Sequence, residues 1–274
     1  MIYYCICCNN EVRKTTHVDW LFHDKLLYCE NCGHMQMLKK PDFHVLKEYY
    51  SKEYKSSRGR IINDTYINIM KERAISQLNF IQSNLMNFQI KNAVDIGCGY
   101  GLLLEELKKN QMDASGVEFD PDCVTNCIER GLKVTLVSEE SDIIPDEMSD
   151  LVIASHVLEH IREPDTFLTE IKRKSRVVFI EIPKYDAGIN EQFTDQEGHL
   201  NFFTQKSLTS LFERFGYHIL CVESCGPSMN FFWKDEWSWI RVFRRIIKRD
   251  YFFHEYERKN PNGIWVRLLA TTNW

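Results

Sequence analysis

The sequence predicts an α/β fold: a doubly wound sheet of seven strands, preceded by a small N-terminal lobe held together by four cysteines. Three observations support this prediction. Two CxxC pairs lie within the first 32 residues, short apolar runs alternate with helical stretches from residue 93 onward, and a glycine-rich loop follows the first of these runs. A chain of 274 residues has room for one ordinary domain and a small attachment.

Composition and charge exclude several classes of protein. Apolar residues make up 44% of the chain and charged residues 27%, as in ordinary globular proteins. No apolar run approaches the roughly 18 residues that a membrane span needs. The N-terminus lacks the basic start and apolar stretch of a signal peptide, which indicates a cytoplasmic protein. The net charge of −5 disfavours nucleic acid as the main partner, because phosphate binding depends on Lys and Arg.

The spacing of the first cysteines predicts a structural zinc site in a lobe that spans residues 1–40. The four ligands expected are Cys5, Cys8, Cys29 and Cys32. Two CxxC turns supply the tetrahedral sulfur ligands of zinc and leave no open coordination position, so the metal is expected to stabilise the lobe rather than to activate water. Cys7 lies inside the first pair and competes as a ligand, whereas His34 and the other nearby histidines are expected to be bystanders.

The rest of the chain divides into a helical connector and a cofactor-binding domain. Residues 41–90 form the connector, in which apolar residues between 61 and 89 recur at helical spacing. Residues 91–274 form the domain, whose alternating strands and helices predict a parallel sheet. The strands are expected at 93–97, 114–118, 133–137, 150–155, 176–182, 217–224 and 264–272. The helices are expected near 101–110, 121–130, 163–174 and 205–215.

A glycine-rich loop, Gly-Cys-Gly-Tyr-Gly at 97–101, lies where the first strand of this domain turns into its first helix. Its glycines permit a tight turn and close approach of the backbone to a ligand at the carboxyl edge of the sheet. Asp95 stands near the end of the strand, where a carboxylate would repel a pyrophosphate but attract a cationic ligand. Glu118 ends the second strand about twenty residues later, at the position of a carboxylate that binds ribose hydroxyls.

Three segments together resemble the class I S-adenosylmethionine-dependent methyltransferases. They are DIGCGYG at 95–101, GVEFDP at 116–121 and SDLVIASHVLEH at 149–160. The resemblance implies a Rossmann-like methyltransferase fold with S-adenosylmethionine as its cofactor. It also implies that the methionine part is held by Asp95, Gly97 and Gly99, and the ribose by Glu118.

Further residues receive roles from the same resemblance. Ser141 or Asp142 is expected beside the adenine, and the backbone near Ser155 and His156 is expected to face the sulfonium. Methyl transfer to a hydroxyl or to a carbon acid also needs a group that takes a proton. His199 is the first candidate because a histidine can be neutral near pH 7, although its spacing alone leaves a structural role equally open. His156 is the second candidate.

The acceptor is suggested by a narrower similarity. Residues 29–38 and 54–57 are similar to the front of sugar C-methyltransferases that act on nucleotide-linked deoxysugars, and residues 198–204 match a further segment of those enzymes. The similarity implies that His199 is the base and that Tyr54 lies close to the acceptor.

Two departures from that family widen the choice of acceptor. Gly198 replaces the family's Glu, and its large C-terminal domain is not expected here. Small methyltransferases of surface-polysaccharide clusters share the His-Leu-x-Phe-Phe-Thr pattern of residues 199–204. The acceptor expected is therefore a sugar, a nucleotide-sugar or a related small polar metabolite, such as a precursor of a surface polysaccharide or capsule. O-methylation is slightly favoured over C-methylation.

An aromatic and basic insertion at 228–262 has no assigned role. The favoured interpretation is a helix packed on the sheet with a solvated basic face, while an anion-binding wall, a contact between two copies and weak contact with a membrane surface remain open. Two other functions also remain open: an RNA methyltransferase with a zinc lobe, and a non-catalytic zinc-ribbon scaffold. The acidic charge disfavours the first, and the presence of Asp95 and Glu118 disfavours the second. The sequence predicts no oligomeric state.

Overall fold

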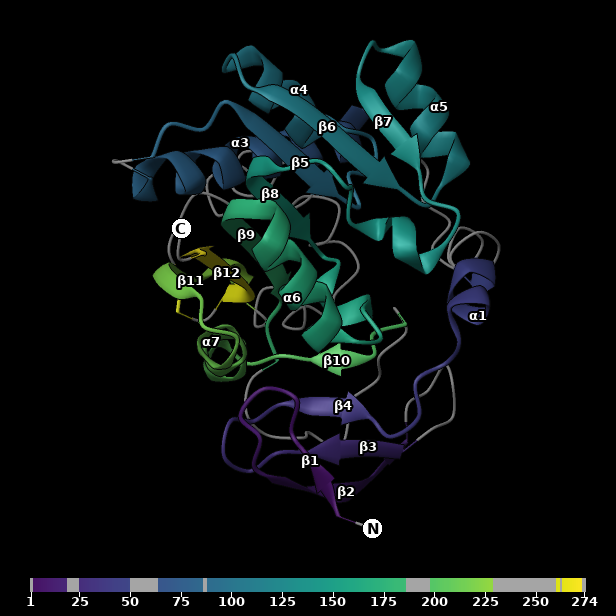
Figure 1. Ribbon diagram of the computed structural model, residues 1–274, viewed down its shortest axis with the longest axis vertical. Helices are drawn as coiled ribbons and strands as arrows, with labels where there is room; N and C mark the ends of the chain where they lie inside the picture. Colours follow the sequence, from purple (N-terminus) through teal and green to yellow (C-terminus); the bar gives the residue numbers. More distant parts are fainter. Residues whose placement is uncertain are drawn as a thin grey trace, which may run out of the picture.

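The computed structural model describes residues 2–18, 25–49, 64–85, 88–185, 198–228, 260–261 and 263–272. These residues form two sheets, a five-stranded one in the order β1-β2-β3-β4-β10 and a seven-stranded one in the order β11-β12-β9-β8-β5-β6-β7 (Figure 1). The small sheet belongs to the N-terminal lobe except for β10, which comes from the larger domain.

The seven strands of the large sheet lie where the sequence predicts them. They are β5 Asn92–Ile96, β6 Asp113–Glu118, β7 Lys133–Leu136, β8 Ser149–Ser155, β9 Ser175–Pro183, β11 His218–Ser228 and β12 Gly263–Thr271. The central pairings are parallel, but β12 runs antiparallel to both of its neighbours, β9 and β11. The expectation of a purely parallel sheet is therefore wrong for this one strand. Apolar periodicity identifies a strand but carries no information about its direction.

Helices cover both faces of this sheet, which confirms the doubly wound architecture. They are α3 Asp64–Asn84, α4 Leu102–Lys109, α5 Pro121–Glu129, α6 Pro164–Lys174 and α7 Gln205–Arg214, with two single-turn helices, η2 Glu140–Ile143 and η3 Leu158–His160. Successive residues of β8 point to opposite faces. Ile153 packs in one apolar cluster with residues of α3, α4 and α5, whereas Val152 packs in another with residues of α6 and α7.

The N-terminal lobe is an antiparallel sheet built around the two CxxC turns. Its strands are β1 Tyr3–Tyr4, β2 Glu11–Val18, β3 Lys25–Tyr28 and β4 Met35–Met37, and β10 Asn201–Phe202 completes the sheet. The pairing of β10 with β4 is antiparallel, with Asn201 opposite Gln36 and Phe202 opposite Met35. In Figure 1, β10 lies between the lobe and the rest of the larger domain. The lobe and the domain therefore share one sheet, an arrangement that was not predicted from the sequence.

The region predicted to be a connector contains α1 Phe43–Glu48 and α3. The predicted helix between 61 and 89 is confirmed as α3, whose Ala74, Leu78 and Ile81 lie in the apolar cluster against the large sheet. Tyr54 lies outside the described residues, as does most of the 228–262 insertion. Among the described residues, no helix is long and apolar enough to cross a membrane.

Candidate active site and metal centre

The two CxxC turns fold into a pair of similar knuckles. In the first, the amide of Cys5 donates to the carbonyl of Asn10 at 2.8 Å, and in the second the amide of Cys29 donates to the carbonyl of His34 at 2.9 Å. The residue after each pair has a positive φ, 56° at Asn9 and 75° at Gly33. Glycine adopts this conformation without strain and asparagine is among the residues that tolerate it, which explains the residue types found there.

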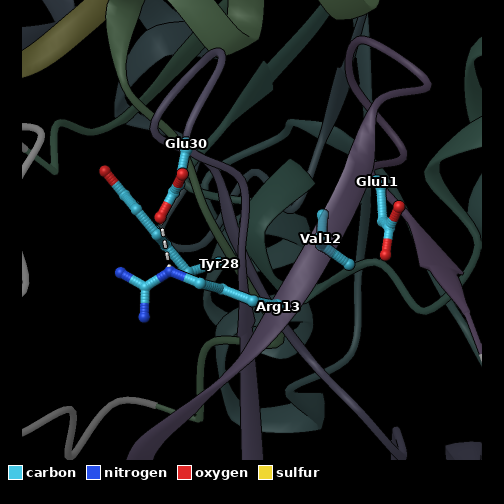
Figure 2. Close-up of a pocket in the computed structure, with 5 residues that line it drawn as sticks. All are labelled: Glu11, Val12, Arg13, Tyr28 and Glu30. Carbon is cyan, nitrogen blue, oxygen red and sulfur yellow. Dashed lines mark hydrogen bonds and ion pairs between the residues drawn. The ribbon is translucent and has the colours of Figure 1, made fainter.

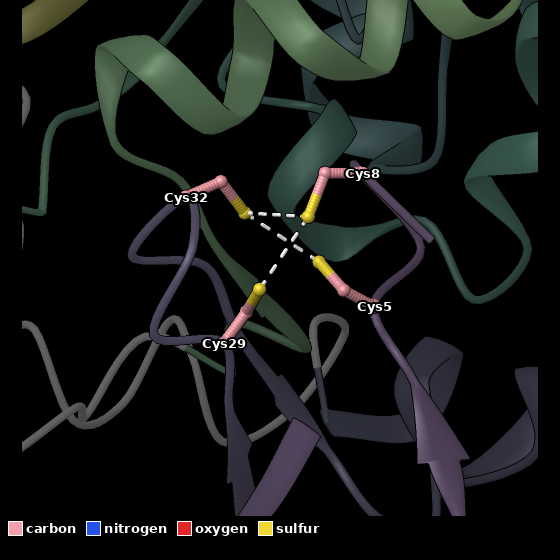
Figure 3. Close-up of side chains that lie close together, drawn as sticks. All are labelled: Cys5, Cys8, Cys29 and Cys32. Atoms are coloured by element: carbon pink, nitrogen blue, oxygen red, sulfur yellow. Dashed lines mark hydrogen bonds between the residues drawn. The ribbon is translucent and has the colours of Figure 1, made fainter. Parts of the chain in front are cut away.

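The four predicted zinc ligands come together at one point, as Figure 3 shows. The Sγ atoms of Cys5 and Cys32 are 3.5 Å apart, and those of Cys8 and Cys29 are 3.4 Å apart. All four sulfurs lie within 4.8 Å of one another, which suits the tetrahedral sulfur shell of a structural zinc. The Nδ2 of Asn10 lies 3.3 Å from the Sγ of Cys8, as a donor that orients a thiolate ligand does.

The cluster of side chains that could hold a metal includes neither Cys7 nor His34. Cys7 is fully buried, and burial raises the pKa of its thiol well above the ordinary value. His34 is also buried, and its ring packs on Phe203 with the centroids 4.8 Å apart. Burial lowers the pKa of His34 to about 4, so the ring is a neutral packing group near pH 7. The four clustered sulfurs therefore come two from each knuckle, an arrangement that is compatible with the predicted zinc site.

The lobe also carries a shallow surface pocket (Figure 2). The pocket is lined by Glu11, Val12, Arg13, Tyr28 and Glu30. The guanidinium of Arg13 is held by the carboxylate of Glu30 at 2.7 Å and lies over the ring of Tyr28. Both charged side chains of this pair are largely exposed, so the pocket offers no buried polar group that would bind a ligand specifically.

The glycine-rich loop after β5 has the geometry that its sequence predicts. Gly97 and Gly99 both have positive φ, 70° and 53°. A Cβ at Gly97 would lie 2.7 Å from Cγ2 of Val157, whereas a Cβ at Gly99 would meet no atom within 4 Å. Gly97 packs tightly against Val157, whereas the space beside Gly99 is open. A ligand at the carboxyl edge of the sheet can therefore approach the loop backbone at Gly99.

Two carboxylates stand beside this loop. Asp95, on β5, is buried, and burial together with the neighbouring charge of Glu118 raises its pKa to about 8. The carboxylate of Glu118, at the end of β6, accepts hydrogen bonds from the amides of Gly99 and Phe119, both at 2.7 Å. Burial raises the pKa of Glu118, and the amide hydrogen bonds act in the opposite direction. A buried carboxyl group beside a half-buried one favours a ligand that carries positive charge and hydroxyl donors.

The residues predicted to lie beside an adenine are in the single-turn helix η2. The carboxylate of Asp142 accepts the amide of Glu139 at 3.2 Å in a reciprocal capping box, so its position is set by this turn. Ser141 belongs to the same turn, and its side chain lies outside the described atoms. The assignment of either residue to adenine stays a prediction.

A buried ion-pair network connects α3 with the carboxyl ends of β8 and β9. Glu181 is fully buried and accepts the Nε of Arg73 at 2.7 Å and the Nε of Arg267 at 2.6 Å. Burial alone would raise the pKa of Glu181, but the two guanidinium groups outweigh it and hold that pKa well below the usual range. Arg73 also donates to the Oγ of Ser155 at 2.8 Å, and Gln77 donates to the same oxygen. The predicted cofactor residue Ser155 is thus oriented by two side chains of α3.

His156 follows Ser155 in a turn that few residues other than glycine adopt. Its φ is 56°, and its amide donates to the carbonyl of Glu181 at 2.7 Å. A non-glycine residue in this conformation stores strain of about 1–3 kcal/mol, and such residues gather at functional sites. Burial and the charge of Arg73 lower the pKa of His156 well below its ordinary value. The ring is therefore neutral and is a weak proton acceptor near pH 7.

His199 belongs to a buried polar cluster next to His156. Its Nδ1 is hydrogen bonded to the hydroxyl of Tyr185 at 2.7 Å, and its ring lies 4.7 Å from the ring of His160. Each of Glu159, His160 and His199 offers a polar atom within 4.8 Å of the others, and a carboxylate oxygen of Glu159 is 3.5 Å from Nδ1 of His156. Glu159 therefore lies near both candidate bases, His156 and His199, and the polar side chains extend without a break from Ser155 to His199.

The glycine loop and its two carboxylates lie where the sequence predicts them, but the side chains that support the site were not predicted. The missed residues are Arg73, Gln77 and Arg267, together with the roles of Glu181 and Tyr185. Arg73 and Arg267 are 108 and 86 residues from Glu181, so no local spacing links them. A charged residue within an otherwise apolar strand, as at Glu181 and Arg267, is the one signal that could have marked the network.

Comparisons with known proteins agree with this geometry. A family model described as a methyltransferase domain matches residues 66–222, which is more than half of the chain. A ubiquinone biosynthesis O-methyltransferase of Methylococcus capsulatus is 29% identical over 107 residues, but the match covers only 36% of this chain and 45% of that relative. An uncharacterized methyltransferase of Schizosaccharomyces pombe is 22% identical over 80% of this chain and 87% of its own length.

Solved structures share the fold at low sequence identity. A possible histamine N-methyltransferase of Thermotoga maritima has a TM-score of 0.53 and 17% identity, and the match covers 84% of this chain and 99% of that one. A Haloferax volcanii putative methyltransferase, solved with the Trm112 methyltransferase activator, has a TM-score of 0.52 and 16% identity, covering 75% of this chain and 92% of that one. These similarities support the fold and leave the acceptor open.

Proposed function

The chain belongs to the class I S-adenosylmethionine-dependent methyltransferases, and we propose that it methylates an oxygen atom of a small polar acceptor. The observation that carries this proposal is the polar cluster of Tyr185, His199 and Glu159, in which His199 and Glu159 are buried and which adjoins the ends of the strands that carry the cofactor residues. A hydroxyl acceptor must lose a proton when it is methylated, and this cluster offers a group to receive that proton.

The donor side of the site suits a cationic nucleoside. S-adenosylmethionine supplies a methyl group that its sulfonium already activates for displacement. Asp95, Gly97 and Gly99 would hold its methionine part, and Glu118 would accept hydrogen bonds from its ribose hydroxyls. The backbone at Ser155 would face the reactive sulfur. The fit is supported by the deep burial of Asp95, because a cation beside that carboxylate compensates the cost of its ionisation.

On the acceptor side, His199 is the proton acceptor that we propose. Its Nδ1 is bonded to Tyr185, so Nε2 is the nitrogen that would take the proton. As the acceptor oxygen forms its bond to the methyl carbon, the bond from carbon to sulfur breaks, its electron pair stays on sulfur and the hydroxyl proton passes to His199. The carboxylate of Glu159, within 4.8 Å, would stabilise the imidazolium that results.

A sugar or a nucleotide-sugar is the acceptor class that we propose. Support comes from the similarity of residues 198–204 to enzymes that methylate sugars and to small methyltransferases of surface-polysaccharide clusters. The partial similarity to ubiquinone biosynthesis O-methyltransferases favours an oxygen acceptor over a carbon acceptor. We also propose that Tyr54 lies near this acceptor.

The proposal is tested by methyl transfer from S-adenosylmethionine carrying a radioactive methyl group to a panel of nucleotide-sugars and simple phenols. His199→Ala is expected to lower turnover by about 10²–10⁴-fold and to leave the affinity for S-adenosylhomocysteine unchanged. His218→Ala is the matched control, because His218 is exposed on β11 and pairs with Thr271 away from the site. Failure of S-adenosylhomocysteine to bind would contradict the donor site, and an unchanged rate in His199→Ala would contradict the assignment of the base.

A further inference from the structure

The segment that carries His199 is also the last strand of the zinc lobe's sheet. Strand β10 begins two residues after His199 and, among the described strands, pairs with β4 alone. The amide of Met37 donates to the carbonyl of Leu200 at 3.0 Å, which extends the ladder to the residue next to His199. A strand of two residues is too short to be stable without its partner, so its position depends on the lobe.

The next residues are anchored directly on the second zinc knuckle. The hydroxyl of Thr204 donates to the carbonyl of the predicted ligand Cys32 at 2.7 Å, and Thr204 is buried. The Nζ of Lys206 is hydrogen bonded to the carbonyl of Asn31, inside the same CxxC turn. The ring of Phe203 packs on His34, which follows the knuckle. Of the residues that follow β10, Thr204 and Lys206 therefore contact the second CxxC turn, and Phe203 contacts a residue just after it.

The opposite side of the segment is bonded to the catalytic edge of the large domain. The amide of Leu200 donates to the carbonyl of Glu159 at 2.8 Å, and the carbonyl of Gly198 accepts Nδ1 of His160 at 3.3 Å. The amide of Tyr185 donates to the carbonyl of Phe203 at 2.8 Å. Residues 198–204 thus lie between the zinc lobe and the polar cluster and contact both.

We propose that the zinc lobe is a positioning element of the active site: the metal-loaded lobe holds residues 198–204 in register, with Thr204 and Lys206 as positioning residues for His199. A lobe of about forty residues has too small a core to be stable alone and depends on its metal to fold. Loss of the metal removes the β4 edge on which β10 forms. The position of His199 then relaxes, while the glycine loop and Glu118, which touch no lobe residue in the contacts described above, keep their geometry.

Only the expected effect of the lobe on turnover rests on the proposed function, in which His199 is the base. The structural coupling between the lobe and residues 198–204 is measured independently of any acceptor. The two proposals can therefore fail separately.

Hydrogen–deuterium exchange of the full chain, before and after zinc removal with a chelator, tests the coupling. Residues 198–204 are expected to lose at least tenfold protection together with residues 25–38, whereas β9 keeps its protection and S-adenosylhomocysteine binds with an unchanged Kd. Restoring zinc should restore the protection. The proposal is overturned if zinc removal lets residues 25–38 exchange freely while residues 198–204 stay protected. It is also overturned if the Kd for S-adenosylhomocysteine rises by the same factor by which residues 198–204 lose protection.

Two substitutions test the coupling in the zinc-loaded protein. Lys206→Met removes the contact to Asn31, and Lys172→Met is its control, because Lys172 likewise donates to carbonyls, those of Phe215 and Gly216, but touches no lobe residue. Faster exchange at 198–204 is expected in the first variant only.

The second substitution tests the bond to the knuckle itself. Thr204→Val removes the bond to Cys32, and Thr204→Ser should retain it. Ser207→Ala controls for the helix cap, since Ser207 bonds Thr204 in the capping box of α7 but not the lobe. Faster exchange in Thr204→Val that Ser207→Ala does not reproduce supports the proposal. Equal exchange at 198–204 in Thr204→Val, Thr204→Ser and the wild type contradicts the role of Thr204.

Discussion

Asp95 predicts a definite pH dependence for cofactor binding. In the ligand-free structure its pKa is raised to about 8, first by burial and then by the charge of Glu118, while Arg73 acts in the opposite direction. A bound ligand with an ammonium or sulfonium group favours the ionised carboxylate and lowers this pKa. Below pH 8 the free protein therefore holds a proton at Asp95 that the complex does not, and binding must release it.

The magnitude follows from the linkage between proton release and affinity. If the pKa in the complex returns close to the ordinary value of 3.8, the affinity falls as the pH drops below 8, by about fivefold in the first pH unit and close to tenfold in the next. From pH 8 to pH 6 the Kd for S-adenosylhomocysteine should rise by about fiftyfold, equal to about 2.3 kcal/mol, because half of the Asp95 carboxyl groups are already ionised at pH 8. Isothermal titration calorimetry between pH 6 and 8, in buffers with different ionisation enthalpies, measures both the Kd and the number of protons released.

Substitution separates Asp95 from the other titrating groups. Asp95→Asn should bind more weakly at pH 8 but with little dependence on pH, because the group that releases the proton is gone. Glu118→Gln should keep part of the pH dependence, since it removes only the neighbouring charge that adds to the shift at Asp95. Wild-type affinity that stays constant between pH 6 and 8, with no proton released, would refute the proposed contact between Asp95 and the cationic part of the ligand.

Three further predictions follow from the described contacts. Elemental analysis of the purified full chain should find about one zinc per molecule, and protein handled without chelators that contains none would contradict the four-cysteine site. Glu181→Gln should lower the free energy of unfolding by about 3–5 kcal/mol, because it leaves the buried guanidinium of Arg267 and the largely buried one of Arg73 without a counter-charge. Glu30→Gln, in an exposed ion pair, should cost less than about 1 kcal/mol in the same denaturant titration. Gly97→Ala should weaken S-adenosylhomocysteine binding and lower stability more than Gly99→Ala does. Both substitutions add strain at a positive φ, but only the first places a Cβ 2.7 Å from Val157. Equal effects of the two substitutions in thermal melts and binding titrations would show that this packing is unimportant.

The parts of the fold that could be predicted from the sequence are those with local signals. A strand buried on both faces requires a continuous apolar run, and each helix between strands requires an apolar stripe, so β5, α4 and their neighbours were found to within a few residues. The glycine loop and the CxxC turns were found for a related reason. Tight turns and metal ligands demand particular residue types at fixed spacing.

The parts that could not be predicted depend on contacts between distant segments. Nothing near Arg73 or Arg267 in the sequence shows that both meet Glu181, because the meeting is created by the packing of α3 and β12 around β9. The antiparallel direction of β12 could not be predicted either, because it too depends on how distant segments pack together. Antiparallel and parallel pairing differ in the path of the connection, and the path is a property of the whole fold.

Strand β10 shows why a metal site called structural can still bear on catalysis. Two residues, Asn201 and Phe202, are too few for any periodicity to indicate a strand, so the sequence presents the lobe and the catalytic domain as separate units. Their register with Gln36 and Met35 makes them neighbours in one sheet. The four cysteines need not approach the reacting atoms to influence them. It is sufficient that the strand completed by the lobe begins two residues after His199.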